Sequence, residues 1–290
     1  MSVVPSSLES DFASIIVRLK MKLLNIGCGY ITHPDWINLD IAPVSPIVKS
    51  FDLRRGLPAI EGSVDVCYNS HVLEHLSMGE AALLVQECFR VLKSGGIFRL
   101  VVPDLECIVR EYLRCLEHVE LGGEDWDYDW MVLELLDQLV RDRQGGEMAH
   151  YLNQPNLNNE RFVASRVGFE LENCRAAKQK TTLEKLKSKR ISWFVTKIRN
   201  KIAEGMVLAI AGRQAQQAFR EGVFRQSGEV HRWMYDRYSL GRLLKRSGFS
   251  NIRVCKADES GIINFNHYEL DLYRGKIRKP DSLFIEAVKP

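Results

Sequence analysis

Short apolar runs alternate with an amphipathic stretch over residues 21–104, and this alternation is the strongest constraint on the fold. The apolar runs stand at 21–26, 36–41, 47–51, 64–70 and 97–104. Runs of this length that are bounded by glycine, proline or polar residues are typical of buried strands. Strands that alternate with helices along a chain are typical of a parallel sheet. We therefore expect an α/β core.

The amphipathic stretch between the last two runs predicts a helix with one apolar face. That face consists of Ala81, Leu84, Val85, Cys88, Val91 and Leu92. We expect the helix to end at Lys93-Ser94-Gly95-Gly96, because glycine adopts the left-handed conformation of a C-terminal cap without strain.

The core pattern returns near the end of the chain after a long interruption. Residues 236–249 predict a helix, and residues 251–257 and 282–289 predict two strands that form a closing hairpin. Residues 105–235 lack the alternation of strands and helices, and they predict a mainly helical insertion that caps the substrate. The expected parts are a leader at 1–20, a core at 21–104 and 236–290, and an insertion at 105–235.

The first apolar run ends at Gly27-Cys28-Gly29, where the missing Cβ atoms let the backbone approach a ligand closely. A dinucleotide site needs a small residue three positions after the second glycine, and this chain has Thr32 there. Such a site also needs an acid roughly twenty residues on, whereas Asp40 comes earlier. The turn therefore favours a nucleoside whose ribose hydroxyls bind the Asp40 carboxylate.

A second acid, Asp52, stands where the next strand would end. Its carboxylate is placed to accept a hydrogen bond from an adenine amino group, with Leu53 covering the ring. An aspartate at a strand end also commonly caps a turn, so both roles stay open.

Three polar residues follow the run at 64–70, and a helical turn would bring His71, Glu74 and His75 to one face. One histidine can act as a general base, because the ordinary pKa of histidine, about 6.5, suits proton abstraction at neutral pH. Alternatively, the three side chains bind a divalent metal ion, or His75 only packs and keeps the turn rigid.

Two further residues are candidates for the chemistry. Asp104 follows the run at 97–104 and either accepts a hydroxyl proton or caps the next helix. His231 lies in HRWMYDRY, where aromatic and polar side chains together suit a sugar ring.

Several segments occur in a fixed order over residues 21–104, namely LLNIGCG, INLD, FDL, SVDVCYNSHVLEHL and ECFRVLKSGGIFRLVVPDL. Together they resemble class I S-adenosylmethionine-dependent methyltransferases. With GGEMAHYL and EVHRWMYDRYSLGRLLKRSGF, the chain is similar to predicted methyltransferases of bacterial polysaccharide and cell-surface glycan synthesis. The resemblance implies a Rossmann-like, seven-stranded, mostly parallel sheet with helices on both faces.

The resemblance also implies S-adenosylmethionine as the cofactor. Where the family usually has an acid two positions before the first glycine, this chain has Asn25. The implied cofactor-binding residues are Asn25, Gly27, Cys28, Gly29, Asp40, Ile41, Asp52, Leu53, Asn69, Ser70 and His71. The turn is similar to a metal-binding ExxEH pattern of some small-RNA and ubiquinone-pathway O-methyltransferases, with His71 in place of the first acid.

The activity that the resemblance implies is O-methylation of a sugar or glycan hydroxyl. One alternative is methylation of a natural-product small molecule or a peptide. Another is a catalytically inactive module that binds only the nucleoside.

The segment 175–201 is strongly basic, with ten lysines or arginines and a single acid. Because apolar residues are mixed with cations at helical spacing up to residue 212, the segment 175–212 predicts a solvated helix or a surface for anionic lipid. The net charge of the chain is only +3 and aromatics are few, so no nucleic-acid partner is expected.

The cellular location is predicted from the cysteines and the leader. Seven scattered cysteines without a CxxC pair favour reduced thiols, and residues 1–20 lack the pattern of a secretory signal. We expect a cytoplasmic protein, peripheral at the inner membrane face if the basic segment binds lipid.

Overall fold

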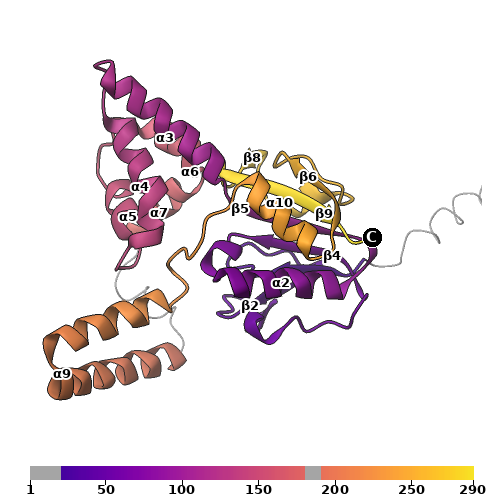
Figure 1. Cartoon of the computed structure of the whole chain (residues 1–290), viewed down its shortest axis with the longest axis horizontal. Helices are drawn as coiled ribbons and strands as arrows, with labels where there is room; N and C mark the ends of the chain where they lie inside the picture. The colour runs from indigo at the N-terminus through magenta and orange to yellow at the C-terminus, as the bar shows by residue number, and fades with distance from the viewer. Residues whose placement is uncertain (1–20, 180–190) are drawn as a thin grey trace, which may run out of the picture.

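The computed structural model describes residues 21–179 and 191–290, and its largest element is a seven-stranded sheet (Figure 1). The strand order is β3-β2-β1-β4-β5-β9-β6. The strands are β1 (Leu23–Ile26), β2 (Trp36–Asp40), β3 (Val48–Ser50), β4 (Val64–Ser70), β5 (Leu92–Pro103), β6 (Ser250–Cys255) and β9 (Ser282–Val288). The first five are parallel, and β9 is antiparallel to both β5 and β6. The predicted mostly parallel sheet, with an antiparallel pair at its end, is confirmed, whereas the leader at 1–20 lies outside the described residues.

Two amphipathic helices, α2 (Met78–Val91) and α10 (Arg237–Arg246), cover one face of the sheet. Each begins with a capping box, formed by Ser77 with Glu80 and by Asp236 with Ser239, which satisfies backbone N–H groups of the first turn. The other face is covered by the connection 256–271, whose 3₁₀ helix η3 (Phe265–Tyr268) packs near Trp36. A small hairpin, β7 (Leu272–Tyr273) and β8 (Lys276–Ile277), follows it.

The glycine pair after α2 does not cap the helix, so that prediction is wrong. The helix ends at Val91, and Leu92 is already extended and begins β5. Gly95, with φ +77°, lies in an irregular part of the strand where its N–H donates to the Lys289 carbonyl at 2.8 Å. The positive φ that this glycine permits is used in the sheet rather than at the helix end.

A buried ionic network joins β5 to β9 and to the connection 256–271. The guanidinium of Arg99 is fully buried and donates to Asp271 at 2.7 Å and to Glu286 at 2.8 Å. The Tyr68 hydroxyl also donates to Asp271, at 2.5 Å. Because each buried charge has its partners, the network fixes the connection on the sheet.

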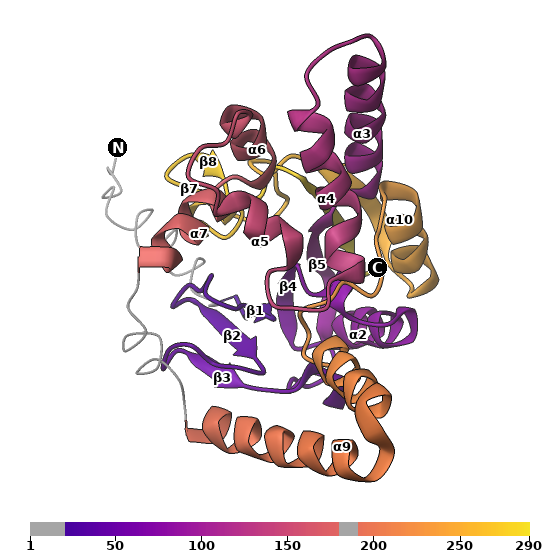
Figure 2. The same ribbon diagram turned by 90° about the vertical axis from the view of Figure 1, so that its left-hand side faces the viewer.

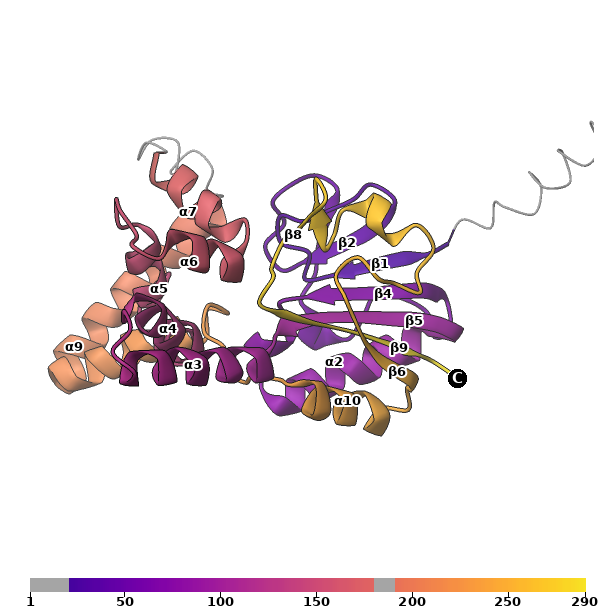
Figure 3. The same ribbon diagram turned by 90° about the horizontal axis from the view of Figure 1, so that it is seen from above.

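The regular elements in the described part of 105–235 are helices, as expected. They are α3 (Leu105–Glu120), α4 (Trp126–Val140), α5 (Gly146–Leu152), α6 (Glu160–Val167), α7 (Glu170–Gln179) and α9 (Ile191–Arg225). Helices α3 to α7 share a hydrophobic core around Trp130, whose indole N–H donates to Glu134. Figure 3 shows these helices beyond the end of the sheet at which β5 ends, so they stand at the carboxyl edge of the parallel strands.

Helix α9 is interrupted at Gly212, where φ is +81° and ψ is −177°, and its two arms lie side by side (Figures 1 and 2). Glu204 on the first arm pairs with Arg220 on the second and accepts a hydrogen bond from Gln216 at 3.2 Å. Part of the basic segment, residues 180–190, lies outside the described residues. Across the described helices, none is both long enough and apolar enough to cross a bilayer.

Candidate cofactor and reaction site

A pocket of about 400 Å³ opens at the carboxyl ends of β1, β2 and β4. Strands β2 and β4 lie on opposite sides of β1. The connections that leave the carboxyl ends of these strands therefore diverge, and the crevice between them can receive a ligand. The lining residues are Gly27, Gly29, Asp40, Ile41, Asp52, Leu53, Arg54, His71, Val72, His75, Leu76, Glu80, Gln226, Ser227, Gly228 and Arg232.

The glycine turn after β1 requires both of its glycines. Gly27 and Gly29 have φ values of +69° and +51°, which side-chain-bearing residues rarely adopt. A Cβ on Gly27 would lie 2.3 Å from the Val72 side chain, so the close packing also excludes any larger residue. Next to Gly29 the space is open, as expected for a turn that receives a ligand.

Asp40 is the last residue of β2, and its carboxylate accepts hydrogen bonds from two backbone N–H groups. Oδ2 accepts from the Gly29 N–H at 2.9 Å, and Oδ1 accepts from the Ala42 N–H at 2.8 Å. Each oxygen retains a second lone pair for the hydroxyls of a ribose. Ile41, mostly exposed at 61%, offers an apolar surface beside it.

Asp52 combines the two roles that the sequence left open. It lines the pocket and also caps the 3₁₀ helix η1 (Leu53–Arg55) through the Arg54 N–H. The Arg54 guanidinium donates to both carboxylate oxygens, at 2.9 and 2.8 Å, and this pairing lowers the pKa of Asp52 to about 2. An adenine amino group that binds Asp52 must therefore share it with Arg54.

Four of the predicted cofactor residues lie behind the lining rather than in it. Asn25 donates to the Ile31 carbonyl at 2.9 Å and to Asn38 at 3.0 Å, and Asn69 donates to the Ile26 carbonyl at 2.9 Å. These amides hold the strand ends and the loop around the turn. Cys28 lies within the turn and Ser70 ends β4, and neither of them lines the pocket. Burial, together with the charge of Asp40, raises the pKa of the Cys28 thiol to about 11.

The turn after β4 brings His71, Glu74 and His75 together, as their spacing predicts. His71 has a φ of +53°, its Nε2 lies 2.9 Å from Ser282 Oγ, and its Nδ1 lies 3.1 Å from Glu74. Glu74 is fully buried in the 3₁₀ helix η2 (Leu73–His75). Burial alone would raise its pKa, but the adjacent His71, followed by His75 and His231, lowers it below the ordinary value.

His231 joins this group from the end of the insertion. Its ring packs edge-on against His75, with ring centroids 4.7 Å apart, and the backbone N–H of His231 donates to the Gln138 carbonyl. Burial lowers the pKa of His231 to about 3, so its imidazole is neutral. Asp104, in contrast, caps α3 through Oδ1, which accepts from the N–H groups of Glu106 and Cys107.

Part of the pocket wall consists of residues that no sequence motif marks. Val72 packs against the glycine turn, and Gln226, Ser227 and Gly228 approach from the end of α9. Arg232 donates to Gln226 at 2.7 Å and to Glu80 at 3.4 Å, which ties this segment to the start of α2. No local motif marks residues 226–228, because only the return of the insertion brings them to the core.

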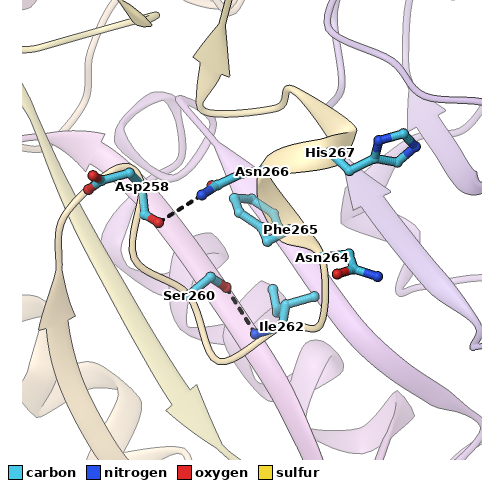
Figure 4. A pocket seen from close by; sticks show the side chains of 7 residues that line it. All are labelled: Asp258, Ser260, Ile262, Asn264, Phe265, Asn266 and His267. Carbon is cyan, nitrogen blue, oxygen red and sulfur yellow. Dashed lines mark hydrogen bonds between the residues drawn. The ribbon is translucent and has the colours of Figure 1, made fainter. Parts of the chain in front are cut away.

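A second hollow, of about 370 Å³, lies beside η3 and shares no lining residue with the first pocket (Figure 4). The Asn266 side chain donates to the Asp258 carbonyl, and the Ile262 N–H donates to Ser260 Oγ. These hydrogen bonds close the connection 256–271 over the sheet, so the hollow belongs to the covering loop.

Comparison with known proteins finds similarity to methyltransferases. Residues 39–100 match the family model described as "Methyltransferase domain". A curated protein of Mycolicibacterium smegmatis, named "Probable S-adenosylmethionine-dependent methyltransferase", is 39% identical over 74 residues, which cover 24% of this chain and 28% of that protein. The chain thus spans little more than a quarter of the length of that relative.

Two solved structures are similar at low identity. A SAM-dependent methyltransferase from Archaeoglobus fulgidus is 12% identical, with a TM-score of 0.37 over 98% of this chain and 93% of that one. The YcgJ protein from Bacillus subtilis is 20% identical, with a TM-score of 0.26 over 39% of this chain and 57% of that one. The matched segment 39–100 contains the end of β2, the turn after β4 and helix α2. Together, the family model and the curated relative show that the segment 39–100 is similar to methyltransferase domains.

Proposed function

We propose that the chain transfers the methyl group of S-adenosylmethionine to the oxygen of a sugar or glycan hydroxyl. The observation that carries the proposal is the Asp40 carboxylate, fixed by two backbone N–H groups beside an open glycine turn. This arrangement fits the two hydroxyls of a ribose. It contains no row of glycine amides that would bind a diphosphate.

The acceptor is proposed from the part of the pocket wall that the insertion supplies. Gln226, Ser227 and Arg232 line the pocket with polar groups, and Trp233, which follows Arg232 in the chain but does not line the pocket, is 42% exposed. Polar groups beside an aromatic face match the hydroxyls and the apolar face of a sugar ring. A small natural product or a peptide is the alternative acceptor, and a module that binds the nucleoside without reaction is the second alternative.

The reaction is a displacement in which the acceptor oxygen attacks the methyl carbon in line with the departing sulfur. The protein must hold that oxygen about 3 Å from the carbon and give its proton a path away. His71 and His75 both line the pocket, and Glu74 lies between them. We place the reacting end of the cofactor at this turn.

Replacing Asp40 by alanine tests the cofactor site. We expect the affinity for S-adenosylhomocysteine to fall roughly 100- to 1,000-fold, because two hydrogen bonds to a charged acceptor are lost. Isothermal titration calorimetry measures the change. The control is Asp35→Ala, at an exposed side chain outside the pocket, which should bind as the wild type does. A wild-type protein that binds neither S-adenosylmethionine nor S-adenosylhomocysteine contradicts the proposal.

The acceptor is tested with methyl-tritiated S-adenosylmethionine and a panel of nucleotide sugars, oligosaccharides, phenols and peptides. Label in the sugar-containing acceptors supports the proposed class. Label only in phenols or peptides replaces it with the first alternative, and cofactor binding without any transfer across the panel favours the second.

We also propose that the first arm of α9 binds an anionic lipid surface. Val195, Ile198, Ile202 and Met206 are all more than half exposed and are spaced to form one face of the helix. Lys197, Arg199 and Lys201 lie on the same arm. An apolar helix face with cations beside it is typical of helices that lie in a membrane interface.

Liposome pelleting tests the lipid surface. The wild type should sediment with vesicles that contain phosphatidylglycerol and remain in solution with phosphatidylcholine vesicles. The double variant Ile198→Ser/Ile202→Ser should lose most of the binding. In contrast, Leu113→Ser removes an exposed apolar side chain of α3 and should retain it. Equal sedimentation of the wild type with both vesicle types would refute an electrostatic lipid surface.

A further inference from the structure

We propose that Glu74, His75 and His231 bind a divalent transition-metal ion at the wall of the cofactor pocket. One donor atom from each of the three side chains lies within 4.8 Å of the others. His75 also lines the pocket, so the ion would stand at its boundary. The donor set differs from the His71, Glu74 and His75 set that sequence spacing suggests, because His231 comes from the far end of the insertion.

Buried polar atoms without hydrogen-bond partners mark this cluster. Glu74 is fully buried; its Oε1 forms an ion pair with Nδ1 of His71 at 3.1 Å, whereas its Oε2 has neither an ion pair nor a hydrogen-bond partner among the described residues. Nδ1 of His231, which is only 4% exposed, likewise has no hydrogen-bond partner among the described residues. Burying a carboxylate oxygen and an imidazole nitrogen without hydrogen-bond partners is costly. A bound cation would offset this cost.

Hydrogen bonds around the three side chains hold the donor atoms in position. Nδ1 of His75 lies 3.3 Å from the Val230 carbonyl, so it carries the hydrogen and leaves the Nε2 lone pair as a ligand. The carbonyl of Glu74 accepts from the N–H groups of Arg232 and Trp233, at 2.7 and 3.2 Å. These hydrogen bonds hold the segment that carries His231 against η2. The donors are therefore positioned by backbone contacts before any ion binds.

The class of ion follows from the donor atoms. Two imidazole nitrogens and one carboxylate oxygen favour Zn²⁺, Mn²⁺ or Fe²⁺, whereas Mg²⁺ prefers a shell of oxygens. Tetrahedral Zn²⁺ with bonds of about 2.1 Å needs donors about 3.4 Å apart. The three donor atoms would therefore have to approach one another by about 1 Å when the ion binds.

The role of the ion rests on the proposed methyl transfer. Three protein ligands leave coordination positions for the acceptor oxygen, and coordination lowers the pKa of a hydroxyl. The hydroxyl proton passes to water, the oxygen forms a bond to the methyl carbon, and the carbon–sulfur bond breaks. The sulfonium becomes the neutral sulfur of S-adenosylhomocysteine, so charge and atoms balance with one proton released.

Calorimetry on the full chain after chelator treatment tests the site, with ZnCl₂, MnCl₂ and MgCl₂ titrated separately. We expect one Zn²⁺ or Mn²⁺ per chain and binding of Mg²⁺ at least 100-fold weaker. Glu74→Gln and His231→Gln should each weaken Zn²⁺ binding at least 100-fold. His150→Gln, at an exposed histidine of α5, is the matched control and should bind as the wild type does.

S-adenosylhomocysteine affinity is measured on the same samples. If the wild type binds the cofactor but none of the ions, or if both site variants bind Zn²⁺ as the wild type does, the metal site is refuted and the proposed function stands. If it binds an ion but no cofactor, the proposed function fails and the metal site stands.

Pulsed electron paramagnetic resonance of the Mn²⁺-loaded wild type is independent of how the variants fold. Modulation from two imidazole nitrogens is expected. A spectrum without nitrogen coupling would refute the ligand assignment.

Discussion

Gly27→Ala is expected to weaken binding of S-adenosylhomocysteine at least 100-fold and to destabilise the protein by about 2–4 kcal/mol. The left-handed backbone costs alanine about 1–2 kcal/mol, and the new Cβ would lie 2.3 Å from Val72, which must shift. Because Val72 belongs to the pocket wall, its shift distorts the cofactor site. Calorimetry gives the affinity and urea denaturation gives the free energy of unfolding.

The control for this variant is Gly62→Ala. Gly62 also has a positive φ, +59°, but a Cβ there meets nothing within 4 Å, and it does not line the cofactor pocket. Gly62→Ala should lose only the about 1–2 kcal/mol that a left-handed backbone costs alanine, and it should bind the cofactor as the wild type does. Equal loss of affinity in both variants would show that backbone strain, and not the contact with Val72, decides the effect.

Arg99→Met is expected to destabilise the chain by about 3–5 kcal/mol, because it leaves the buried Asp271 and Glu286 carboxylates without their shared cation. The free energy of unfolding from urea denaturation measures the loss. Methionine retains much of the arginine's length, so the missing charge dominates over the missing volume.

Arg253→Ala removes a second partner of the same Glu286, from a side chain that is 54% exposed. Solvent screens this pair, and the expected loss is at most about 1 kcal/mol. A loss as large as that of Arg99→Met would show that the exposed cation, rather than the buried one, stabilises Glu286.

The cofactor turn was predictable because its determinants are close in sequence. Gly27, Gly29 and Asp40 lie within 14 residues, and the Gly29 N–H donates to Asp40 itself. Strand-end position alone correctly placed Asp52 in the pocket, but it did not reveal that Arg54, two residues on, occupies both carboxylate oxygens.

The features that the sequence did not reveal depend on contacts between residues that are far apart in the chain. Arg99 pairs with groups 172 and 187 positions away, and no periodicity in β5 reveals a buried cation there. Gly95 and Gly96 resemble a helix cap locally, but they lie within β5, where both form backbone hydrogen bonds with Lys289. In both places, contacts with residues distant in the sequence determine the local structure.

The contact between His75 and the Val230 carbonyl joins residues 155 positions apart. On a ribosome that adds about 5–20 residues per second, the interval between synthesis of these two residues is roughly 8–30 s. During that interval the glycine turn can form, whereas the histidine from the insertion is still missing. The pocket wall, in contrast, is complete only after Gln226, Ser227, Gly228 and Arg232 have been made, so the end of the insertion closes a site that the first strands begin.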